Sequence, residues 1–373
     1  MQDAQHGGTI FKPQFLKCAI FFCACLYVCS CCVLLLSLAI AIPVALLRRQ
    51  SYPVHTIMVD GVARSFIVFV PSALARTATP TEAPLLLGLH GGTGSAQAYA
   101  RRNGFVEVAE RYGAIAVFPD GLPCTGVVDA LHCWNSGTID SKPAADDLRF
   151  LQMLVTRLLP NVTSGEIADF QQSLLGNSNL RVDWRRIYLT GHSNGALMAY
   201  RMAGSSHGNL FAAVAPVSGA IGGRRAPDSP QFIIDTPVTP ITVLHVHGLQ
   251  DDNVPMNSTQ PHAGFLPNSI YIPTFDGISF FLNANNCTPS IYNPLATRKY
   301  ANGVKSSFTY YNNAQCSAGT DVMTLLMDAS HAWVDMDSVM NSYPIPSSPI
   351  SGLDKATSLA EVIWLIISTY SRQ

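Results

Sequence analysis

Ser193 is the residue of this chain whose surroundings most clearly predict chemistry. It lies between two glycines in the segment LTGHSNGALMAYRMAG (residues 189–204), after an apolar run that predicts a strand and before a run that predicts a helix. Glycine is costly to order in either element, so its presence on both sides predicts a tight turn with no room for side chains. The G-x-S-x-G pattern between a strand and a helix is typical of a nucleophile elbow, which lifts the serine hydroxyl clear of the sheet. We therefore predict that Ser193 is a nucleophile.

A serine hydroxyl attacks only when a base removes its proton, and the base needs an acid to orient it. In strand–elbow–helix proteins these groups follow in the order serine, acid, histidine. Asp251 and Asp252 follow the apolar run 241–248, and His331 follows the apolar run 322–329. His262 is the only other histidine after Asp252, and it lies in a proline-rich stretch without a preceding strand. We predict His331 as the base and one of the two aspartates as the acid.

Backbone N–H groups near the elbow are predicted to bind the oxyanion that develops during such a reaction. The N–H of Asn194 opens the predicted helix, whose dipole favours negative charge. His90 begins the glycine-rich loop HGGTG after another predicted strand. The N–H of Gly92 or Thr93 in this loop is the predicted second donor, because glycines permit a close approach of the backbone.

The remaining histidines near these motifs are predicted to have structural roles. His192 is the variable residue of the elbow, where packing beside the substrate is favoured over reaction. His245 and His247 precede the acid and lie within a predicted strand or at its end. A structural hydrogen bond is the favoured interpretation for both.

The elements that must position these residues alternate between strand and helix from residue 53 onward. Residues 55–71 predict two strands joined by a turn at Asp60–Gly61, and residues 95–113 carry helical spacing. A helix at 145–159 has Asp146 or Asp147 as its predicted N-cap, and residues 354–370 predict a helix packed on the sheet. This alternation predicts a mostly parallel central sheet with helices on both faces. Further strands are expected at 84–91, 114–121, 185–191, 211–219, 241–248 and 322–330, a further helix at 195–204, and loops or small insertions at 161–180, 220–240, 256–275 and 337–352.

The composition excludes several classes of protein. The chain has 373 residues, of which 48% are hydrophobic and 13% charged, and its net charge is −1. Such a balance argues against disorder and against a surface that binds nucleic acid. The length alone is compatible with one large domain or two.

Residues 18–47 form an uncharged, largely apolar run between Lys12 and Lys17 on one side and Arg48 and Arg49 on the other. The run is longer than the roughly 20 residues that span a bilayer and than the h-region of a signal peptide. We predict a transmembrane signal anchor at 18–47, a cytoplasmic tail at 1–17 and a catalytic domain at 48–373. Secretion after cleavage of the segment is the alternative.

Glycosylation sequons and cysteines favour a lumenal or extracellular position for the domain. Three N-x-S/T sequons begin at Asn161, Asn257 and Asn286, all in predicted loops. Six of the ten cysteines lie in or beside the anchor: Cys18, Cys23, Cys25, Cys29, Cys31 and Cys32.

The other four cysteines are even in number, as expected in an oxidising compartment. We favour the pairing of Cys124 with Cys133 and of Cys287 with Cys316 over the two other pairings. The chain has no C-x-x-C spacing in this region, so a metal site is not expected.

Several motifs occur together in an order that resembles a known family. They are PLLLGLHGGTGSA, FPDG followed by CWNSG, DDLRFL, VDWRRIYLTGHSNGALMAYRMA, LFAAVAPVSGA, HVHGLQDDNVP and SHAW. The set resembles the polyhydroxybutyrate depolymerase and feruloyl esterase-like group of α/β-hydrolases, related to carbohydrate esterase family 1, over residues 53–370. The resemblance implies an α/β-hydrolase fold and an ester hydrolase with Ser193, Asp251 and His331 as its triad. The family's HGxxD motif matches residues 247–251, which favours Asp251 over Asp252, and its late cysteine pair resembles Cys287 and Cys316.

The sequence departs from this family at two places. Ala196 stands where a further glycine usually follows the elbow, and residues 330–334 read SHAWV where the family has a glycine and a proline around the histidine. The second departure changes the loop that carries His331, and it therefore bears on the choice of substrate more than on the catalysis. Trp134, Trp333 and His192 are candidates for contacting the substrate, and the two tryptophans are equally compatible with core packing.

The segment 256–275 contains Phe265, Tyr271 and Phe275. It is expected to be either part of a lid over the acyl group or an ordinary surface insertion.

The predicted function is therefore that of a serine esterase that needs no metal or organic cofactor. Polyhydroxyalkanoates, feruloyl or acetyl sugars and short-chain esters are all compatible substrates. The alternatives are a serine peptidase, an acyltransferase of the same fold, and a non-catalytic binding module on a cell surface. The sequence predicts no oligomeric state.

Overall fold

The computed structural model describes residues 51–125, 131–139, 145–159, 165–257, 261, 268–288, 294–299, 305–311, 316–333, 356 and 358–372. The chain divides into two units, Met1–Gln50 and Ser51–Gln373. The predicted tail and anchor, residues 1–47, lie outside the described residues, as do Asn161, His262, Phe265 and the segment 337–352. Among the helices that are described, none is both long enough and apolar enough to cross a membrane.

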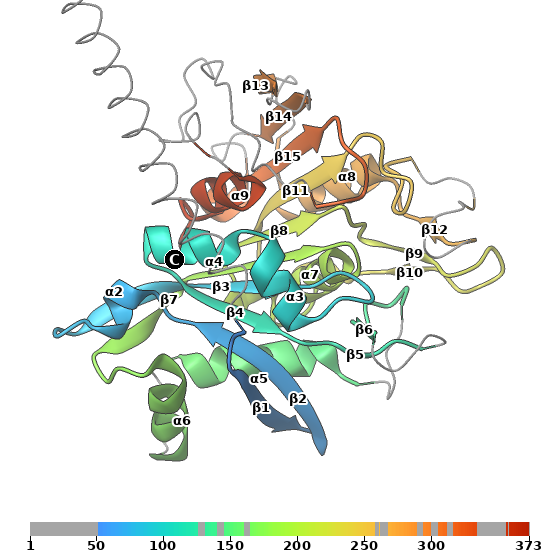
Figure 1. Ribbon diagram of the computed structural model, residues 1–373. Coiled ribbons are helices and arrows are strands. Elements are labelled where there is room, and N and C mark those ends of the chain that lie inside the picture. Colours follow the sequence, from blue (N-terminus) through green and yellow to red (C-terminus); the bar gives the residue numbers. More distant parts are fainter. Residues whose placement is uncertain are drawn as a thin grey trace, which may run out of the picture. The chain divides into compact units, whose positions relative to one another are not determined.

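One large sheet forms the centre of the second unit (Figure 1). Its strands are β1 (Val54–Val59), β2 (Val62–Phe69), β3 (Thr81–Leu89), β4 (Ile115–Pro119), β7 (Leu180–His192), β8 (Ala213–Val217), β11 (Thr242–Gly248), β13 (Pro294–Lys299), β14 (Lys305–Tyr311) and β15 (Val322–Met327). They lie in the order β1-β2-β4-β3-β7-β8-β11-β15-β14-β13. The six strands from β4 to β15 in that order pair in parallel, and the two at each edge pair antiparallel. The predicted mostly parallel sheet is confirmed.

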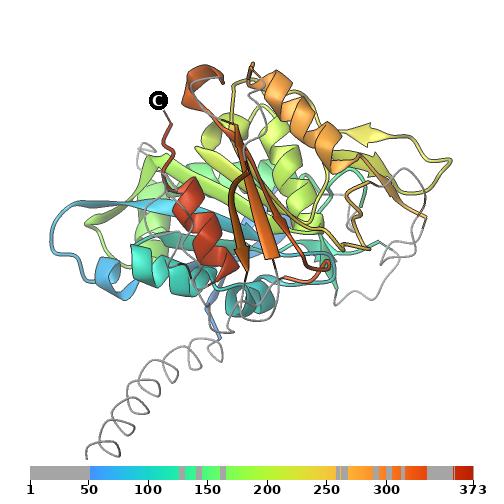
Figure 2. The ribbon, with the colours of Figure 1, turned by 90° about the horizontal axis from the view of Figure 1, so that it is seen from above.

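Helices cover both faces of this sheet, as Figure 2 shows. Alternate residues of β3 face opposite sides: Leu85 and Leu87 pack in one core cluster and Leu86 in the other. The first cluster also contains buried residues of α5, α6, α7 and α8, and the second those of α3, α4 and α9. This two-layered covering is what a parallel sheet needs, because both of its faces are apolar. The helices are α2 (Ser72–Ala75), α3 (Ala96–Arg102), α4 (Phe105–Tyr112), α5 (Asp147–Leu158), α6 (Gly165–Leu175), α7 (Asn194–Gly204), α8 (Thr274–Ala284) and α9 (Leu359–Ile367), with 3-10 turns at Gly208–Leu210 and Ser317–Gly319.

Two small sheets lie outside the central one. The first is the hairpin of β5 (Leu122–Pro123) and β6 (His132–Cys133), and the second joins β9 (Gly222–Arg224), β10 (Phe232–Ile233) and β12 (Ile270–Tyr271). Together with the central sheet and its helices, this arrangement is an α/β-hydrolase-like fold.

The helix predicted at residues 95–113 is in fact two helices, α3 and α4. Gly104 lies between them with a φ of 83°, a left-handed conformation that breaks the helix and that glycine adopts without strain.

At the next predicted helix, Asp146 is the N-cap, because its side chain accepts a hydrogen bond from the N–H of Arg149. Asp147 is instead the first residue of α5 and is buried.

The sequence did not predict several elements, of which the largest are helices α6 and α8 and the hairpin of β13 and β14. Helix α6 lies within the predicted loop 161–180, and α8 begins at the end of the predicted loop 256–275. Proline and polar residues around both segments gave a loop signal. In α8, however, Ile278 and Phe281 are buried in the first core cluster, on one face of the central sheet. Tertiary packing therefore outweighs local composition.

Candidate active site

The turn at Ser193 explains the two glycines of the G-x-S-x-G segment. Ser193 has φ 56° and ψ −120°, a strained backbone for a non-glycine residue, and it joins β7 to α7. A Cβ atom on Gly191 would lie 2.3 Å from the carbonyl oxygen of Gly195, and one on Gly195 would lie 2.5 Å from the carbonyl oxygen of His90. Both positions therefore exclude a side chain, and the turn lifts Ser193 above the end of the sheet.

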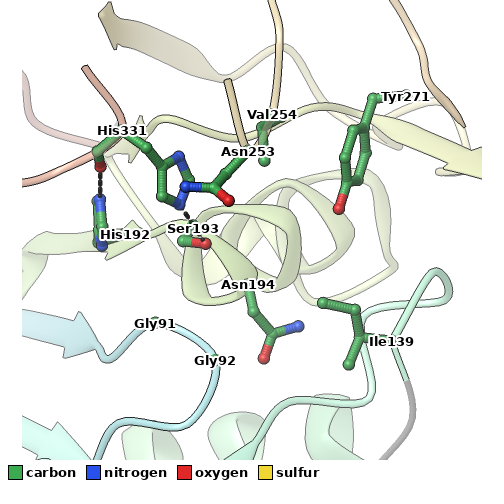
Figure 3. A pocket seen from close by; sticks show the side chains of 10 residues that line it. All are labelled: Gly91, Gly92, Ile139, His192, Ser193, Asn194, Asn253, Val254, Tyr271 and His331. Atoms are coloured by element: carbon green, nitrogen blue, oxygen red, sulfur yellow. Dashed lines mark hydrogen bonds between the residues drawn. The ribbon is translucent and has the colours of Figure 1, made fainter. Parts of the chain in front are cut away.

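Ser193, His331 and Asp251 form a continuous hydrogen-bonded line. Nε2 of His331 lies 2.8 Å from Oγ of Ser193, and Figure 3 draws this hydrogen bond as a dashed line. Nδ1 of the same ring lies 2.9 Å from Oδ1 and 2.8 Å from Oδ2 of Asp251. The three residues come from the carboxyl ends of β7, β11 and β15, where parallel strands place their following loops on one edge.

Asp251 is held in place by more than His331. Its Oδ1 accepts hydrogen bonds from the N–H groups of Asn253 (3.0 Å) and Val254 (2.8 Å), and Oδ2 lies 3.3 Å from Nε2 of His247. Burial raises the pKa of the Asp251 carboxyl, but the hydrogen bonds from His247 and His331 outweigh it and hold the pKa well below its usual range. Asp251 is therefore ionised, whereas the competing candidate Asp252 is exposed.

Two backbone N–H groups beside Ser193 are suited to bind an oxyanion. Gly92 and Asn194 both line the cavity at Ser193. Neither N–H donates to any acceptor in the part of the chain that the structure describes. The N–H of Thr93, in contrast, donates to the carbonyl of His132 at 2.8 Å. The structure therefore contradicts Thr93 as a donor and leaves Gly92 as the candidate from this loop.

The side chain of Asn194 has a role that the sequence did not reveal. Its Oδ1 accepts from the N–H of Trp134 at 2.7 Å, and its Nδ2 donates to the carbonyl of Trp134 and to Oγ of Ser136, both at 3.1 Å. Asn194 is buried, and these bonds fix it against the segment after β6. They hold the start of α7, and with it the N–H that faces the cavity. Both partners, Trp134 and Ser136, belong to the motif CWNSG, but only the folded structure brings that motif next to Asn194.

Trp134 does not line the cavity at Ser193, and of the two interpretations that the sequence left open the structure supports core packing. The side chain is fully buried, and its indole N–H donates to the carbonyl of His90 at 2.9 Å. An indole buried in a core needs such a partner. Trp134 therefore packs against the glycine-rich loop 90–94, which carries the predicted oxyanion donor Gly92 and is called the oxyanion loop below.

Trp333 and His192 lie beside the serine rather than at it. Trp333 packs edge-on against Tyr99, Phe105 and His192 and lines a neighbouring cavity of about 260 Å³ behind the oxyanion loop. His192 lines both cavities. Burial and the nearby His331 lower the pKa of His192 to about 4, so its neutral ring donates from Nε2 to the carbonyl of His331 at 2.8 Å.

The cavity at Ser193 has a volume of about 240 Å³ and a largely apolar far wall. Ile139, Val254 and Tyr271 form that wall, and the Tyr271 hydroxyl points into the cavity (Figure 3). Burial raises the pKa of Tyr271 to about 12, so the hydroxyl keeps its proton. Of the aromatic residues in segment 256–275, Tyr271 thus reaches the site, whereas Phe275 is exposed.

A second carboxylate with two histidines lies on the other side of the oxyanion loop. Oδ1 of Asp120 lies 3.1 Å from Nε2 of His90 and 3.2 Å from Nδ1 of His132, and it accepts from the N–H of Ala96. The nearby carboxylate of Asp120 raises the pKa of His132. Burial raises the pKa of Asp120, but the two histidines lower it further, to well below its usual range. The cluster ties the end of β4 to the loop that carries Gly92.

Asp147 belongs to a buried ion pair and not to the site. Its Oδ1 pairs with the Arg64 guanidinium at 2.5 Å, and its Oδ2 accepts from the N–H of Asn135 at 2.6 Å. Burial raises the pKa of Asp147 above its usual value. The pair joins β2 and α5 to the segment that Asn194 holds.

The disulfides follow the favoured pairing, Cys124 with Cys133 and Cys287 with Cys316. The first closes the hairpin of β5 and β6, and the second joins the end of α8 to the segment before β15. Asn257 and Asn286 are both exposed. Within the described residues, no group of histidine, cysteine, aspartate and glutamate side chains is arranged to hold a metal ion.

The sheet with its helices forms an α/β-hydrolase-like fold, and comparisons with known proteins extend this result. No protein-family model matches the chain. Acetylxylan esterase A from Emericella nidulans is 30% identical over 148 residues, which is 40% of this chain and 40% of that protein. Acetylxylan esterase A from Talaromyces purpureogenus is 27% identical over 154 residues, 41% of this chain and 32% of that protein. The chain thus matches less than half the length of each.

Among solved structures, an acetyl xylan esterase from Aspergillus awamori superposes with a TM-score of 0.43 at 14% identity, covering 75% of this chain and 94% of that one. The sequence relatives are named as esterases. The resemblance to the carbohydrate esterase-like group of α/β-hydrolases is therefore confirmed.

Proposed function

We propose that this protein is a serine esterase that hydrolyses carboxylic esters through an acyl-enzyme, with Ser193 as nucleophile, His331 as general base and Asp251 as the acid that orients it. The observation that carries the proposal is the pair of hydrogen bonds made by one imidazole, 2.8 Å to Oγ of Ser193 and 2.8 Å to Oδ2 of Asp251. These distances meet the requirement that a nucleophile and its base lie within hydrogen-bond reach. The esterase names of the sequence relatives support the same reaction class.

In this mechanism His331 removes the Ser193 proton as Oγ bonds to the ester carbonyl carbon, and the carbonyl π electrons move to its oxygen. When the intermediate collapses, the bond to the alkoxy group breaks and His331 gives its proton to the leaving alcohol. Water then attacks the acyl carbon and loses a proton to His331. The bond between the acyl carbon and Oγ of Ser193 breaks, His331 returns the proton to Oγ, and the acid leaves. Asp251 is ionised throughout and stabilises the imidazolium that forms in each half.

The oxyanion is proposed to lie between the N–H groups of Asn194 and Gly92. Both residues line the serine cavity, and both N–H groups lack an acceptor among the described residues. Donors that are already fixed before the reaction need no reorganisation in the transition state, and one of them is worth about 3 kcal/mol of barrier.

The preferred acyl group is proposed to be short. A cavity of about 240 Å³ is smaller than the roughly 300–1,000 Å³ of pockets that enclose drug-sized ligands. Its wall of Ile139, Val254 and Tyr271 suits an acyl chain. Acetyl or other short-chain esters, including sugar esters, therefore fit better than a feruloyl group or a hydroxyalkanoate oligomer bound wholly inside it.

We further propose that residues 18–47 anchor the protein in a membrane, with the tail 1–17 in the cytoplasm and the catalytic domain lumenal or extracellular. The uncharged length of the segment, two disulfides and the exposed sequons at Asn257 and Asn286 support this position. Deglycosylation of the full chain expressed in a secretory host should increase its gel mobility. Asn257→Gln and Asn286→Gln should each remove part of that shift, and a band without any shift would contradict the lumenal position.

The esterase proposal is tested by hydrolysis of p-nitrophenyl acetate, butyrate and octanoate, with p-nitroanilide analogues, by the wild type and Ser193→Ala. We expect ester hydrolysis to decrease with acyl length and the variant to lose activity by about 10,000-fold or more. The substitution removes only one oxygen atom, so the free energy of unfolding should be nearly unchanged and the unfolding curves of the two proteins should coincide. Activity that survives the substitution would refute Ser193 as nucleophile, and faster cleavage of the anilides would indicate a peptidase.

A further inference from the structure

Three buried polar side chains lie behind Asp251, and the proposed mechanism uses none of them. They are His247 and His245 on β11 and Tyr200 on α7, each no more than 1% exposed. Burial of polar groups is costly unless each finds a hydrogen-bond partner. The burial of these three polar side chains therefore needs a structural or functional explanation.

The three side chains connect end to end on one face of the sheet. His245 and His247 are two residues apart on β11 and so point to the same face, where their rings stack with centroids 5.1 Å apart. The Tyr200 hydroxyl lies 2.5 Å from Nδ1 of His245, and Nε2 of His245 lies 3.0 Å from Nδ1 of His247. The Tyr200 ring in turn stacks on Phe281 of α8. The chain runs from α7 across β11 to the acid.

The last link of this chain reaches Asp251 and the loop that holds it. Nε2 of His247 lies 2.8 Å from the carbonyl oxygen of Val254 and 3.3 Å from Oδ2 of Asp251. The N–H of Val254 is itself bonded to Oδ1 of Asp251. One ring nitrogen thus contacts both the carboxylate and the turn that fixes it.

The chemistry of the end group fixes the direction of every hydrogen bond. A carbonyl and an ionised carboxylate only accept, so Nε2 of His247 must carry a proton. At the other end, burial raises the pKa of Tyr200, so its hydroxyl keeps its proton and donates to Nδ1 of His245, whose Nε2–H then donates to Nδ1 of His247. Burial holds the pKa of His245 well below its usual value, which keeps that ring neutral. Only this assignment of the neutral rings makes all three bonds, and all of them point toward Asp251.

We propose that His247, His245 and Tyr200 form a directed hydrogen-bond relay whose function is to position the Asp251 carboxylate for His331. The relay rests on the proposed function, because it acts on the acid of that triad. His247 holds Oδ2 and the Val254 carbonyl on the side opposite the backbone donors, so the carboxylate cannot rotate away from the imidazole. Bonds aligned in one direction polarise each other, so Tyr200 strengthens the contact at His247 from a distance. The three are positioning residues and touch no substrate.

A matched pair of substitutions separates the relay from simple core filling. His247→Gln keeps an N–H donor near the position of Nε2, whereas His247→Met has nearly the same shape as glutamine and no donor. We expect His247→Met to lower kcat for p-nitrophenyl acetate by about 10- to 100-fold, in the range found for supporting hydrogen bonds around other active sites. KM should remain within about twofold, because His247 itself does not line the serine cavity, and His247→Gln should recover most of the loss. Equal kcat values for the two variants would overturn the relay.

A double-mutant cycle with Asp251→Asn asks whether His247 acts through the acid. If it does, His247→Met should cost little in the Asp251→Asn background, because there is no carboxylate to position. A full additional loss in that background would show a structural role and overturn the proposal. Loss of activity in Asp251→Asn alone tests the proposed triad, so failure of the triad and failure of the relay give different results.

Tyr200→Phe is the second variant, and it removes a single oxygen atom without opening a cavity. It breaks only the hydrogen bond farthest from Asp251. Because neighbouring hydrogen bonds strengthen one another only modestly, we expect a smaller fall in kcat, about two- to fivefold. The fall should disappear in the His247→Met background, where the relay is already broken. Should His247→Met fail to fold, Tyr200→Phe and His245→Gln decide the matter, since wild-type kcat in both would refute the relay.

Discussion

Two carboxylates with very similar surroundings lie on either side of the oxyanion loop, and only one of them faces the serine. Asp251 follows β11 and Asp120 follows β4, and both have pKa values held well below the usual range by neighbouring histidines. Each lies within 3.3 Å of two imidazole nitrogens, those of His331 and His247 in the first cluster and those of His90 and His132 in the second.

The two clusters differ in the group that contacts the other ring nitrogen of the histidine. The far nitrogen of His331 reaches Oγ of Ser193 at the cavity. In the second cluster, Nε2 of His90 accepts from the N–H of Gly121 and its Nδ1 contacts the carbonyl of Gly91, so the backbone occupies both nitrogens. An aspartate–histidine pair is thus a reactive device only where the chain leaves the outer nitrogen for a nucleophile. Where backbone groups contact both ring nitrogens, as at His90, the aspartate and its histidines only hold neighbouring segments of the chain together.

The sharpest way to break this comparison is to neutralise each carboxylate in turn. Asp251→Asn should lower kcat by about 10,000-fold, as expected when the amide imposes the wrong tautomer on the catalytic imidazole. Asp120→Asn should lower it by no more than about tenfold, because this group only holds the loop that carries Gly92. Steady-state hydrolysis of p-nitrophenyl acetate measures both. Comparable losses would mean that the second cluster takes part in the chemistry.

A smaller effect is expected at Asn194, where the serine turn meets the segment that leads from the second cluster. Asn194→Ala removes three hydrogen bonds to Trp134 and Ser136 but keeps the backbone N–H. We expect kcat to fall by about 10- to 100-fold, less than the 100- to 1,000-fold loss of a whole oxyanion donor. KM for p-nitrophenyl acetate should change little.

Ser136→Ala is the matched control, because it removes only one of the three bonds. It should cost less than Asn194→Ala in the same assay. If the two variants lost equal activity, the bonds to the Trp134 backbone would have no part in holding the donor.

The sequence predicted the reacting groups better than the groups that hold them. Ser193 and His331 each follow an apolar strand, and local patterns report such positions directly. The choice of Asp251 over Asp252 needed the resemblance to a family, because two adjacent carboxylates look alike in a sequence. The structure then separates them by burial and by the N–H groups of Asn253 and Val254.

What the sequence could not predict depends on contacts between distant segments. Thr93 resembled an oxyanion donor until the carbonyl of His132, far along the chain, was found on its N–H. Trp134 was compatible with a pocket or with the core, and only the fold places it beneath His90. His245 reads as an ordinary strand residue, since its partner Tyr200 lies on a helix 45 residues away. Such pairings carry no local signal.

The smallest expected effect sharpens the comparison through stability and its dependence on pH. Asp120 has a lowered pKa, so its contribution to folding is present above the ordinary value near 4 and is lost as the pH falls through the lowered value. His132 has a raised pKa, so its contribution is complete below the ordinary value near 6.5 and is lost as the pH rises through the raised value. Urea unfolding should therefore show the largest difference between wild type and Asp120→Asn from about pH 4 to 6.5, narrowing on both sides. His132→Asn should abolish the alkaline decline and leave part of the acid decline, which comes from the hydrogen bond that Asp120 accepts from the N–H of Ala96. A difference that narrows neither below about pH 4 nor above about pH 6.5 would mean that Asp120 and His132 do not interact in the folded protein. The second cluster would then not hold the loop that carries Gly92.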